Sequence, residues 1–448
     1  MEQKLFQKTV IRIALPVTLQ CLLQSSFSVI DQIMIGQLGS NSIAGIGLGG
    51  KFASLYLVLL NAIAAIAGIM ISQYMGKEDK IAVSKSFFVN LILAFGLAVA
   101  FMCLSITFPH LIMGIYTKDN ATRMLAAEYL RIFAFSFVPM SITVILTTLL
   151  RCMEAANLAL YASVFALILN TGLNYLLIFG KWIFPALGVK GAALASVIAQ
   201  IVCCGVISFF FIIVMKRKQL KLHSMSWEKT LDIGYWKQYL CILCPMLICE
   251  FIWSLGENVY AAIYGNMGTD ACAAITMTLP IQTLVIGALS GLAQASGILI
   301  GKALGTGDEV RAYRESKYLV KYGLYGSLFL SLLLVMVSPF YVRIYNVDSA
   351  VQILTRNILI VFAIISPIKV QNMILGGGIL RSGGKTKYTM WIDFIGTWLL
   401  GVPMGLIAAF IWNLSIPYVY LILSIEECAR LGISVVIFKK KVWMERLD

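Results

Sequence analysis

The sequence is a succession of twelve long apolar stretches separated by short polar connections. A membrane-spanning helix needs about 20 apolar residues. On that scale the spans fall at residues 10–36, 42–73, 86–108, 124–150, 158–179, 190–215, 238–264, 271–301, 317–341, 351–380, 388–411 and 417–438. Only helices and closed barrels satisfy their backbone hydrogen bonds in lipid, and the runs here do not alternate as barrel strands do. We therefore predict an all-α membrane protein with twelve transmembrane helices.

Composition supports lipid as the solvent. Of 448 residues, 60% are hydrophobic and only 12% are charged, whereas a soluble domain carries about 25% charged residues. A larger core does not explain the deficit, because single soluble cores stop growing at about 250–300 residues.

The basic residues lie mainly in the terminal segments and in the connections after even-numbered spans. The opposite connections hold only Lys118, Arg123, Lys181, Lys190, Arg343 and Arg356. Because positively charged connections stay in the cytoplasm, we expect a multi-pass plasma-membrane protein with both termini inside. The net charge of +14 then reflects topology, with membrane lipids as partners and no nucleic acid.

The second half of the sequence repeats the first at an almost constant offset in numbering. Residues 36–40 match 265–269 and residues 68–71 match 297–300, both at an offset of 229, and Leu150-Arg151 matches Leu380-Arg381 at an offset of 230. Each repeat holds six spans, an even number, so both halves enter the membrane in the same orientation.

This repeat predicts two six-helix lobes, related by a pseudo-two-fold axis along the membrane normal. We place the N-lobe at residues 1–215, a cytoplasmic linker at 216–237 and the C-lobe at 238–448. Such lobes are the usual framework for alternating access to a site at the repeat interface.

Asp31 is the clearest polar residue inside a predicted span. A charge at the centre of a membrane helix costs about 2.5–3.5 kcal/mol on insertion scales, so its presence asks for a reason. We interpret Asp31 as a group that loads and releases a proton or a cation. The alternative is a hydrated residue near the outer interface.

Three further acids belong to the second half. Glu250 and Glu257 lie seven residues apart, on one face of the seventh helix, and Asp393 lies in the eleventh. They are ion-coupling candidates on a polar stripe that faces a cavity. The alternative is a buried structural pair with Lys51 or Lys369.

Four other residues are candidates for a polar substrate cleft. Asn170 and Asn174 lie one turn apart on the fifth helix, where they either line a cavity or bond across helices. Lys51 and Lys369 lie too far from the helix ends to reach water easily, and we expect each to pair with an acid. We read Glu426, Glu427 and Arg430 as a self-neutralising cluster on the last helix.

The sequence offers little for catalysis. It has two histidines, no clustered metal ligands, and no Walker-type loop for ATP hydrolysis. The pair Cys241 and Cys244 has no second pair, and we read it as inert thiols. We expect no enzyme activity and no cofactor, and transport driven by an ion gradient or by the substrate's own gradient.

Several motifs resemble one family. Residues 14–16 and 31–39 (DQIMIGQLG) look like the opening of the multidrug and toxic compound extrusion (MATE) family, and residues 250–256 and 264–268 are similar to a bacterial branch of it. Residues 169–180 and 187–193 fit its middle segment, and residues 380–385 resemble its Arg-x-x-Gly-Asp loop, with Lys385 in place of the acid. The resemblance runs nearly end to end.

The resemblance implies a secondary antiporter that exports organic, commonly cationic, compounds in exchange for Na⁺ or H⁺. Asp31 falls on the helix-1 acid that family members use for coupling, and Asn170 and Asn174 fall on the helix-5 polar pair. These three residues are the candidate Na⁺ ligands. Glu250, Glu257 and Asp393 would serve the C-lobe, and an aromatic wall would hold the organic cation by cation–π attraction. We expect a monomer.

Three other functions remain open at this point. A related flippase for lipid-linked saccharides would use basic residues such as Lys51 and Lys369 for a diphosphate headgroup. A membrane transferase would need a clustered acid or metal site. A receptor without transport would not need the repeat or the buried acids.

Overall fold

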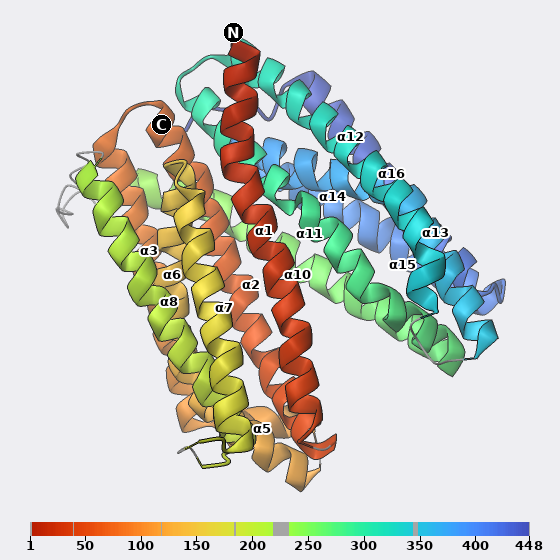
Figure 1. The fold of residues 1–448 in the computed structure, drawn as a ribbon. Helices are drawn as coiled ribbons and strands as arrows, with labels where there is room; N and C mark the ends of the chain where they lie inside the picture. The colour runs from red at the N-terminus through yellow and green to blue at the C-terminus, as the bar shows by residue number, and fades with distance from the viewer. Residues whose placement is uncertain are drawn as a thin grey trace. The chain divides into compact units, whose positions relative to one another are not determined.

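The structure, a computed structural model, describes residues 2–38, 40–117, 119–182, 185–217, 233–343 and 348–447, and these form helices joined by short connections (Figure 1). The helices of the first half are α1 (Glu2–Gly36), α2 (Ser40–Gly76), α3 (Lys80–Thr107), α4 (Pro109–Tyr116), α5 (Asn120–Phe133), the 3₁₀ turn η1 (Ala134–Ser136), α6 (Phe137–Cys152), α7 (Ala156–Phe179) and α8 (Val189–Arg217).

The second half of the sequence also consists of helices. They are α10 (Ile233–Asn266), α11 (Thr269–Gly305), α12 (Glu309–Val342), α13 (Ser349–Asn372), α14 (Thr386–Phe394), α15 (Val402–Leu406) and α16 (Ile416–Lys440), with π-helical segments η2 (Met373–Leu380), η3 (Ile395–Gly401) and η4 (Ile407–Ile411).

The prediction of twelve membrane helices is confirmed. Eleven of the described helical segments are long and apolar enough to cross a membrane. The twelfth, α16, carries Glu426, Glu427 and Arg430 within its apolar sequence. A short helix that was not predicted, α4, precedes the span that α5, η1 and α6 form together.

The helices extend beyond the predicted apolar spans. Helix α12 begins at Glu309 rather than at residue 317, and α10 begins at Ile233 within the predicted linker. A helix does not have to end where the bilayer ends, so its polar turns continue into water. Most of the linker, residues 218–232, lies outside the described part of the chain.

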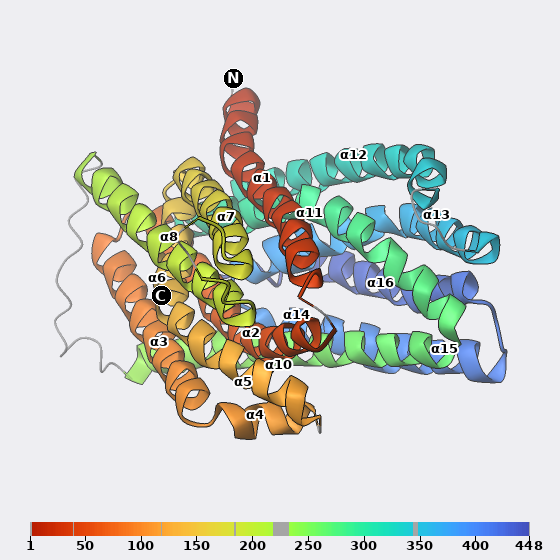
Figure 2. The same ribbon diagram turned by 60° about the horizontal axis from the view of Figure 1, so that its bottom comes forward.

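The chain divides into two compact units. The N-unit comprises Leu19–Ile71 and Asp79–Asp232, and the C-unit comprises Met1–Thr18, Ser72–Glu78 and Ile233–Asp448. In the N-unit α7 packs along α8, and in the C-unit α12 packs along α13 (Figure 2). The predicted N-lobe took in the whole of residues 1–215, and its boundaries stay a prediction.

Two short segments from the first half of the sequence pack within the C-unit. In the first of them, Gln7 Nε2 donates to the Tyr322 hydroxyl at 2.9 Å, and Thr18 Oγ1 donates to the Ala288 carbonyl at 3.1 Å. In the second, the Gln73 side chain donates to the Ser382 carbonyl at 2.6 Å. These polar contacts anchor both segments.

The end of α2 crosses the end of α11 at a pair of glycines in the C-unit. A Cβ atom at Gly76 would collide with the Lys302 carbonyl, and one at Gly305 would collide with the Gln73 carbonyl. Gly76 matches Gly305 at the offset of 229, and Gln73 matches Lys302 at the same offset. The repeat in the sequence therefore corresponds to two matching backbone contacts in the structure. Only glycine allows them, because any side chain would collide with the facing carbonyl.

The N-terminal caps of α3 and α12 also match through the repeat. Asp79 caps α3 by accepting from the backbone N–H groups of Ile81 and Ala82, at 3.0 and 2.9 Å, and Asp308 caps α12 by accepting from Arg311 N–H at 2.8 Å. These two aspartates again match at the offset of 229.

Replacing either cap should destabilise the protein. We expect Asp79→Ala and Asp308→Ala each to lower the free energy of unfolding by about 1 kcal/mol, because each leaves first-turn N–H groups without their acceptor. Thermal unfolding in detergent measures this. Asp348, whose side chain makes no such bond at the start of α13, is the control, and an equal loss in Asp348→Ala would contradict the capping explanation.

Candidate functional site

The N-unit brings Asp31 together with the two asparagines of α7. Asn174 Nδ2 donates to Asp31 Oδ1 at 3.0 Å. With the Asn170 amide turned so that its nitrogen faces the carboxylate, Asn170 Nδ2 lies 3.1 Å from Asp31 Oδ2, and Asn170 Oδ1 accepts from the Ser196 N–H at 3.3 Å. Both carboxylate oxygens therefore face neutral amide donors.

No ion pair with Asp31 is present in the described part of the chain, although the residue is only partly exposed. Two oxygen atoms of α7, Asn174 Oδ1 and Thr171 Oγ1, are buried without a hydrogen-bond partner. Carboxylate, amide and hydroxyl oxygens are the ligands that hard cations prefer. The residues at this place fit a proton or a small cation as a partner of the carboxylate.

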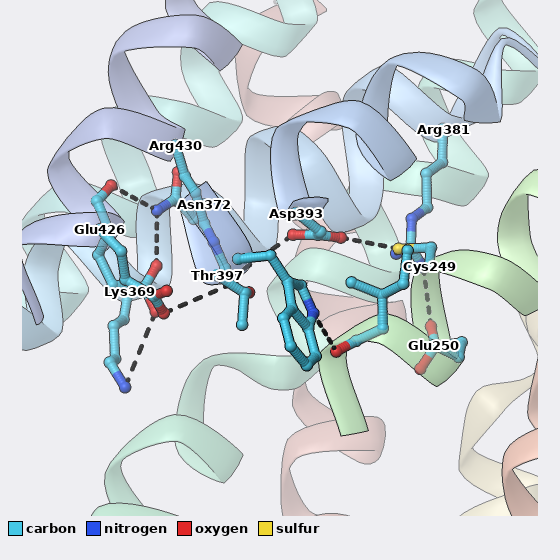
Figure 3. Close-up of polar contacts among 12 residues, drawn as sticks. Cys249, Glu250, Lys369, Asn372, Arg381, Asp393, Thr397, Glu426 and Arg430 are labelled. Carbon is cyan, nitrogen blue, oxygen red and sulfur yellow. Dashed lines mark hydrogen bonds and ion pairs between the residues drawn. The ribbon is translucent and has the colours of Figure 1, made fainter. Parts of the chain in front are cut away.

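The C-unit holds a network of buried and half-buried charges instead. At one end, Arg381 points toward Glu250 and Cys249 of α10 (Figure 3). Arg381 Nη1 lies 3.4 Å from Glu250 Oε1, and Arg381 Nη2 donates to Cys249 Sγ at 3.3 Å. Cys249 in turn donates to Asp393 Oδ2 of α14 at 2.7 Å. The thiol thus connects a guanidinium to a carboxylate.

Arg430 of α16 forms the centre of the network. Its guanidinium lies 3.6 Å from Asp393 Oδ1 and 3.4 Å from Glu426 Oε1, and it donates to the Thr397 hydroxyl. The Tyr260 hydroxyl donates to the second oxygen of Glu426. Removing one member of such a buried set typically costs about 3–5 kcal/mol, because an uncompensated charge remains.

Glu427 completes the network at its far end. Lys369 Nζ lies 3.8 Å from Glu427 Oε1, and Asn372 Nδ2 donates to Glu427 Oε2 at 2.8 Å. Lys369 and Asn372 both lie on α13, so Glu427 joins α16 to α13.

The predicted site residues of the C-unit, together with Lys51, differ in their charged partners and in their exposure. Glu250 and Asp393 contact guanidinium groups, and Lys369 pairs with Glu427 rather than with Glu250 or Glu257. Glu257 and Lys51 are exposed, and neither makes an ion pair among the described residues. The pairing expected for Lys51 is therefore not seen there.

The interpretation of Glu426, Glu427 and Arg430 as a self-neutralising cluster was too narrow. The Glu426–Arg430 pair within α16 is present, but the cluster also reaches α10, α13 and α14. Sequence reasoning gave no role to Cys249, Tyr260 or Thr397. For Arg381, the sequence signal was its match to Arg151 in the repeat.

Cys249 offers a direct test of the network. We expect Cys249→Ser to stay within about 0.5 kcal/mol of wild type, because a hydroxyl makes both contacts. Cys249→Val should lower the free energy of unfolding by about 1–3 kcal/mol, because the Asp393 and Arg381 groups lose a partner. Thermal unfolding of both variants in detergent checks this, and equal stability of the two would contradict a bridging role.

A groove of about 790 Å³ lies elsewhere in the C-unit, along α10 and α14. Its lining includes Trp236, Leu240, Cys244, Ile248 and Trp391. No predicted site residue lines it, so its walls give no reason to place substrate there.

Comparisons with known proteins give the family. The family model described as MatE matches residues 16–176 and 245–407, one segment in each half of the sequence. The chain is 22% identical over 443 residues to "Probable multidrug resistance protein NorM" of Thermotoga maritima, covering 98% of this chain and 94% of that protein. It is 24% identical over 428 residues to "Uncharacterized transporter YisQ" of Bacillus subtilis, covering 93% of this chain and 90% of that protein.

Solved structures agree with the fold. A crystal structure of a MATE protein in its straight conformation superposes with a TM-score of 0.87 at 18% identity, covering 97% of this chain and 96% of that one. A MOP superfamily transporter from Pyrococcus furiosus gives a TM-score of 0.86 at 18% identity, with the same coverage. Because the family model covers most of both halves, the chain belongs to the MatE family, the multidrug and toxic compound extrusion transporters.

Proposed function

We propose that this transporter is a secondary antiporter that exports organic cations in exchange for H⁺ or Na⁺, with Asp31 as the coupling carboxylate. One observation carries the proposal: the amides of Asn170 and Asn174 face the two oxygens of Asp31, and no ion pair with it is present among the described residues. A carboxylate in this setting gains most from a proton or a small cation.

The relatives support the direction of transport. Several of them, including the Thermotoga maritima protein, are named as probable multidrug resistance proteins. Export of small organic compounds from the cytoplasm, across the plasma membrane, is the activity that such a name describes. Binding of the coupling ion at Asp31 and binding of substrate would alternate as the site opens to one side of the membrane and then to the other.

The C-unit acids enter the proposal in different ways. Glu250 and Asp393 contact Arg381 and Arg430, so a coupling ion would have to compete with a guanidinium. Glu257 has no such partner among the described residues and is the remaining C-unit candidate. Lys369 is engaged by Glu427, which leaves less basic surface for the diphosphate of a lipid-linked saccharide.

Transport by reconstituted protein tests the proposal. A fluorescent organic cation is followed in liposomes under an imposed proton gradient and, separately, under a sodium gradient. We expect one of the two gradients to drive the dye out, which also identifies the ion. If neither gradient moves any of a panel of organic cations, antiport of this class is wrong, and flipping of a lipid-linked saccharide becomes the function to measure.

A further inference from the structure

The two units repeat one polar contact pattern. In the N-unit, Gln20 Oε1 accepts from Arg151 Nη2 at 2.9 Å, and Gln20 Nε2 donates to Ser163 Oγ at 2.7 Å. An arginine thus contacts a residue of the first helix, which contacts a residue of the fifth.

The C-unit has the same two contacts at the matching positions. Cys249 matches Gln20 at the offset of 229, and Arg381 and Asp393 match Arg151 and Ser163 at the offset of 230. Arg381 donates to Cys249, and Cys249 donates to Asp393, as described above. Positions that match in sequence therefore match in structure, and the offset of 230 applies through the fifth helix of each half.

The same numbering locates the C-unit counterpart of the Asp31 site. Adding 229 to Asp31 gives Tyr260, and adding 230 to Ser196 gives Glu426. In the N-unit Asp31 faces Asn170, which in turn accepts from Ser196. The site therefore lies where the first, fifth and sixth helices of the half meet.

The C-unit forms the corresponding meeting point. The Tyr260 hydroxyl donates to Glu426, and Gly401 lies directly against both side chains. Gly401 is one position beyond the counterpart of Asn170, which the offset of 230 places at Leu400. The acid lies on the first helix in the N-unit (Asp31) and on the sixth helix in the C-unit (Glu426), at the same meeting point of helices.

Arg430 occupies this place. Its guanidinium lies between Glu426 and Asp393 and donates to Thr397. The residue is only 7% exposed, and Gly396 lies directly against its side chain. The matching N-unit residue is Gln200, which carries no charge. A fixed cation is thus present at the C-unit position, whereas the described groups at the N-unit position are the Asp31 carboxylate, amides and the Thr171 hydroxyl.

We propose that Arg430 is a built-in cation that takes, in the C-unit, the position of the exchangeable ion proposed at Asp31 in the N-unit. The C-unit site would then be permanently occupied, and exchangeable ion binding would be confined to one of the two matching sites. This reading rests on the proposed coupling role of Asp31, and it makes Arg430 a determinant of how many ions move in each cycle.

Replacing the guanidinium by a free cation tests the proposal without measuring transport. Arg430→Ala removes the guanidinium and leaves a space beside two carboxylates. We expect its melting temperature to fall below that of wild type, and millimolar methylguanidinium or Na⁺ to restore at least half of the loss. Choline, at equal ionic strength, should restore little, because it is too large for the space.

Three comparisons make the result specific. Arg430→Lys keeps a fixed cation and should melt independently of added cations, as should wild type. Arg430→Met fills the space with an apolar chain and should not be rescued. If Arg430→Ala cannot be purified, Arg430→Ser, whose small side chain leaves a similar space, is measured in its place.

Two outcomes would overturn the proposal. The first is a melting temperature of Arg430→Ala or Arg430→Ser that does not change with any added cation, which would make Arg430 a structural ion pair only. The second is an equal response to choline, which would indicate ionic strength rather than a site. Dye efflux plays no part in the measurement, so either outcome leaves the proposed antiport at Asp31 open to its own test.

Discussion

Asp31→Asn should abolish gradient-driven efflux at unchanged expression. The substitution keeps the size of the side chain and removes the negative charge that faces Asn170 and Asn174. Asparagine has neither a group that takes up and releases a proton near neutral pH nor the charge that a sodium ion requires. We expect the rate of coupled efflux to fall at least about 100-fold, equivalent to about 2.7 kcal/mol.

The measurement compares dye efflux from proteoliposomes under the gradient that drives wild type. Glu128→Gln is the matched control, because Glu128 is an acid of the same unit that pairs on the surface with Lys190 at 3.4 Å, and its loss should leave the rate unchanged. If Asp31→Asn keeps its gradient dependence while Glu257→Gln loses it, coupling belongs to the C-unit.

The glycine crossing of α2 and α11 should be intolerant of any larger side chain. Gly76→Val and Gly305→Val each introduce atoms where the Lys302 or Gln73 carbonyl already lies. Backbone cannot move aside as a flexible side chain can, so we expect each variant to lose about 3 kcal/mol or more of stability. Gly76 and Gly305 should respond alike, because their contacts match through the repeat.

Melting temperature and the yield of monodisperse protein report this loss. Gly96→Ala in α3 is the control, since no atom lies within 4 Å of a Cβ built there, and alanine favours the helix by about 0.5–1 kcal/mol over glycine. Wild-type stability in Gly76→Val would show that the two helices separate easily at this point.

The membrane helices could be predicted from the sequence because only helices and closed barrels satisfy the backbone hydrogen bonds in lipid. A run of apolar residues as long as that of α2 or α11 has to be a helix that crosses. The extra turns at the start of α12 were missed because Glu309 to Lys317 is polar, and hydropathy measures the bilayer rather than the helix. The π-helical segments η2, η3 and η4 depend on packing, which no local pattern records.

The family resemblance grouped Asp31 with Asn170 and Asn174, and the two asparagines lie one turn apart on one helix. The C-unit network was harder, because it brings together α10, α13, α14 and α16, and the choice of partner is tertiary. Lys369 could have paired with any of several acids, and which one it meets depends on helix rotation. Cys249 and Tyr260 carried no signal, since neither residue type is rare in a membrane helix.

The contacts at Gly76 and Gly305 are also reciprocal. Gly76 meets Lys302, and the equivalents of these two residues, Gly305 and Gln73, meet in the same way. That reciprocity is the signature of an isologous interface, in which one surface patch binds a second copy of itself. The crossing thus has the geometry by which a six-helix unit pairs with a second copy of itself. Elsewhere the two halves differ, as Asp31 in one and Arg430 in the other illustrate.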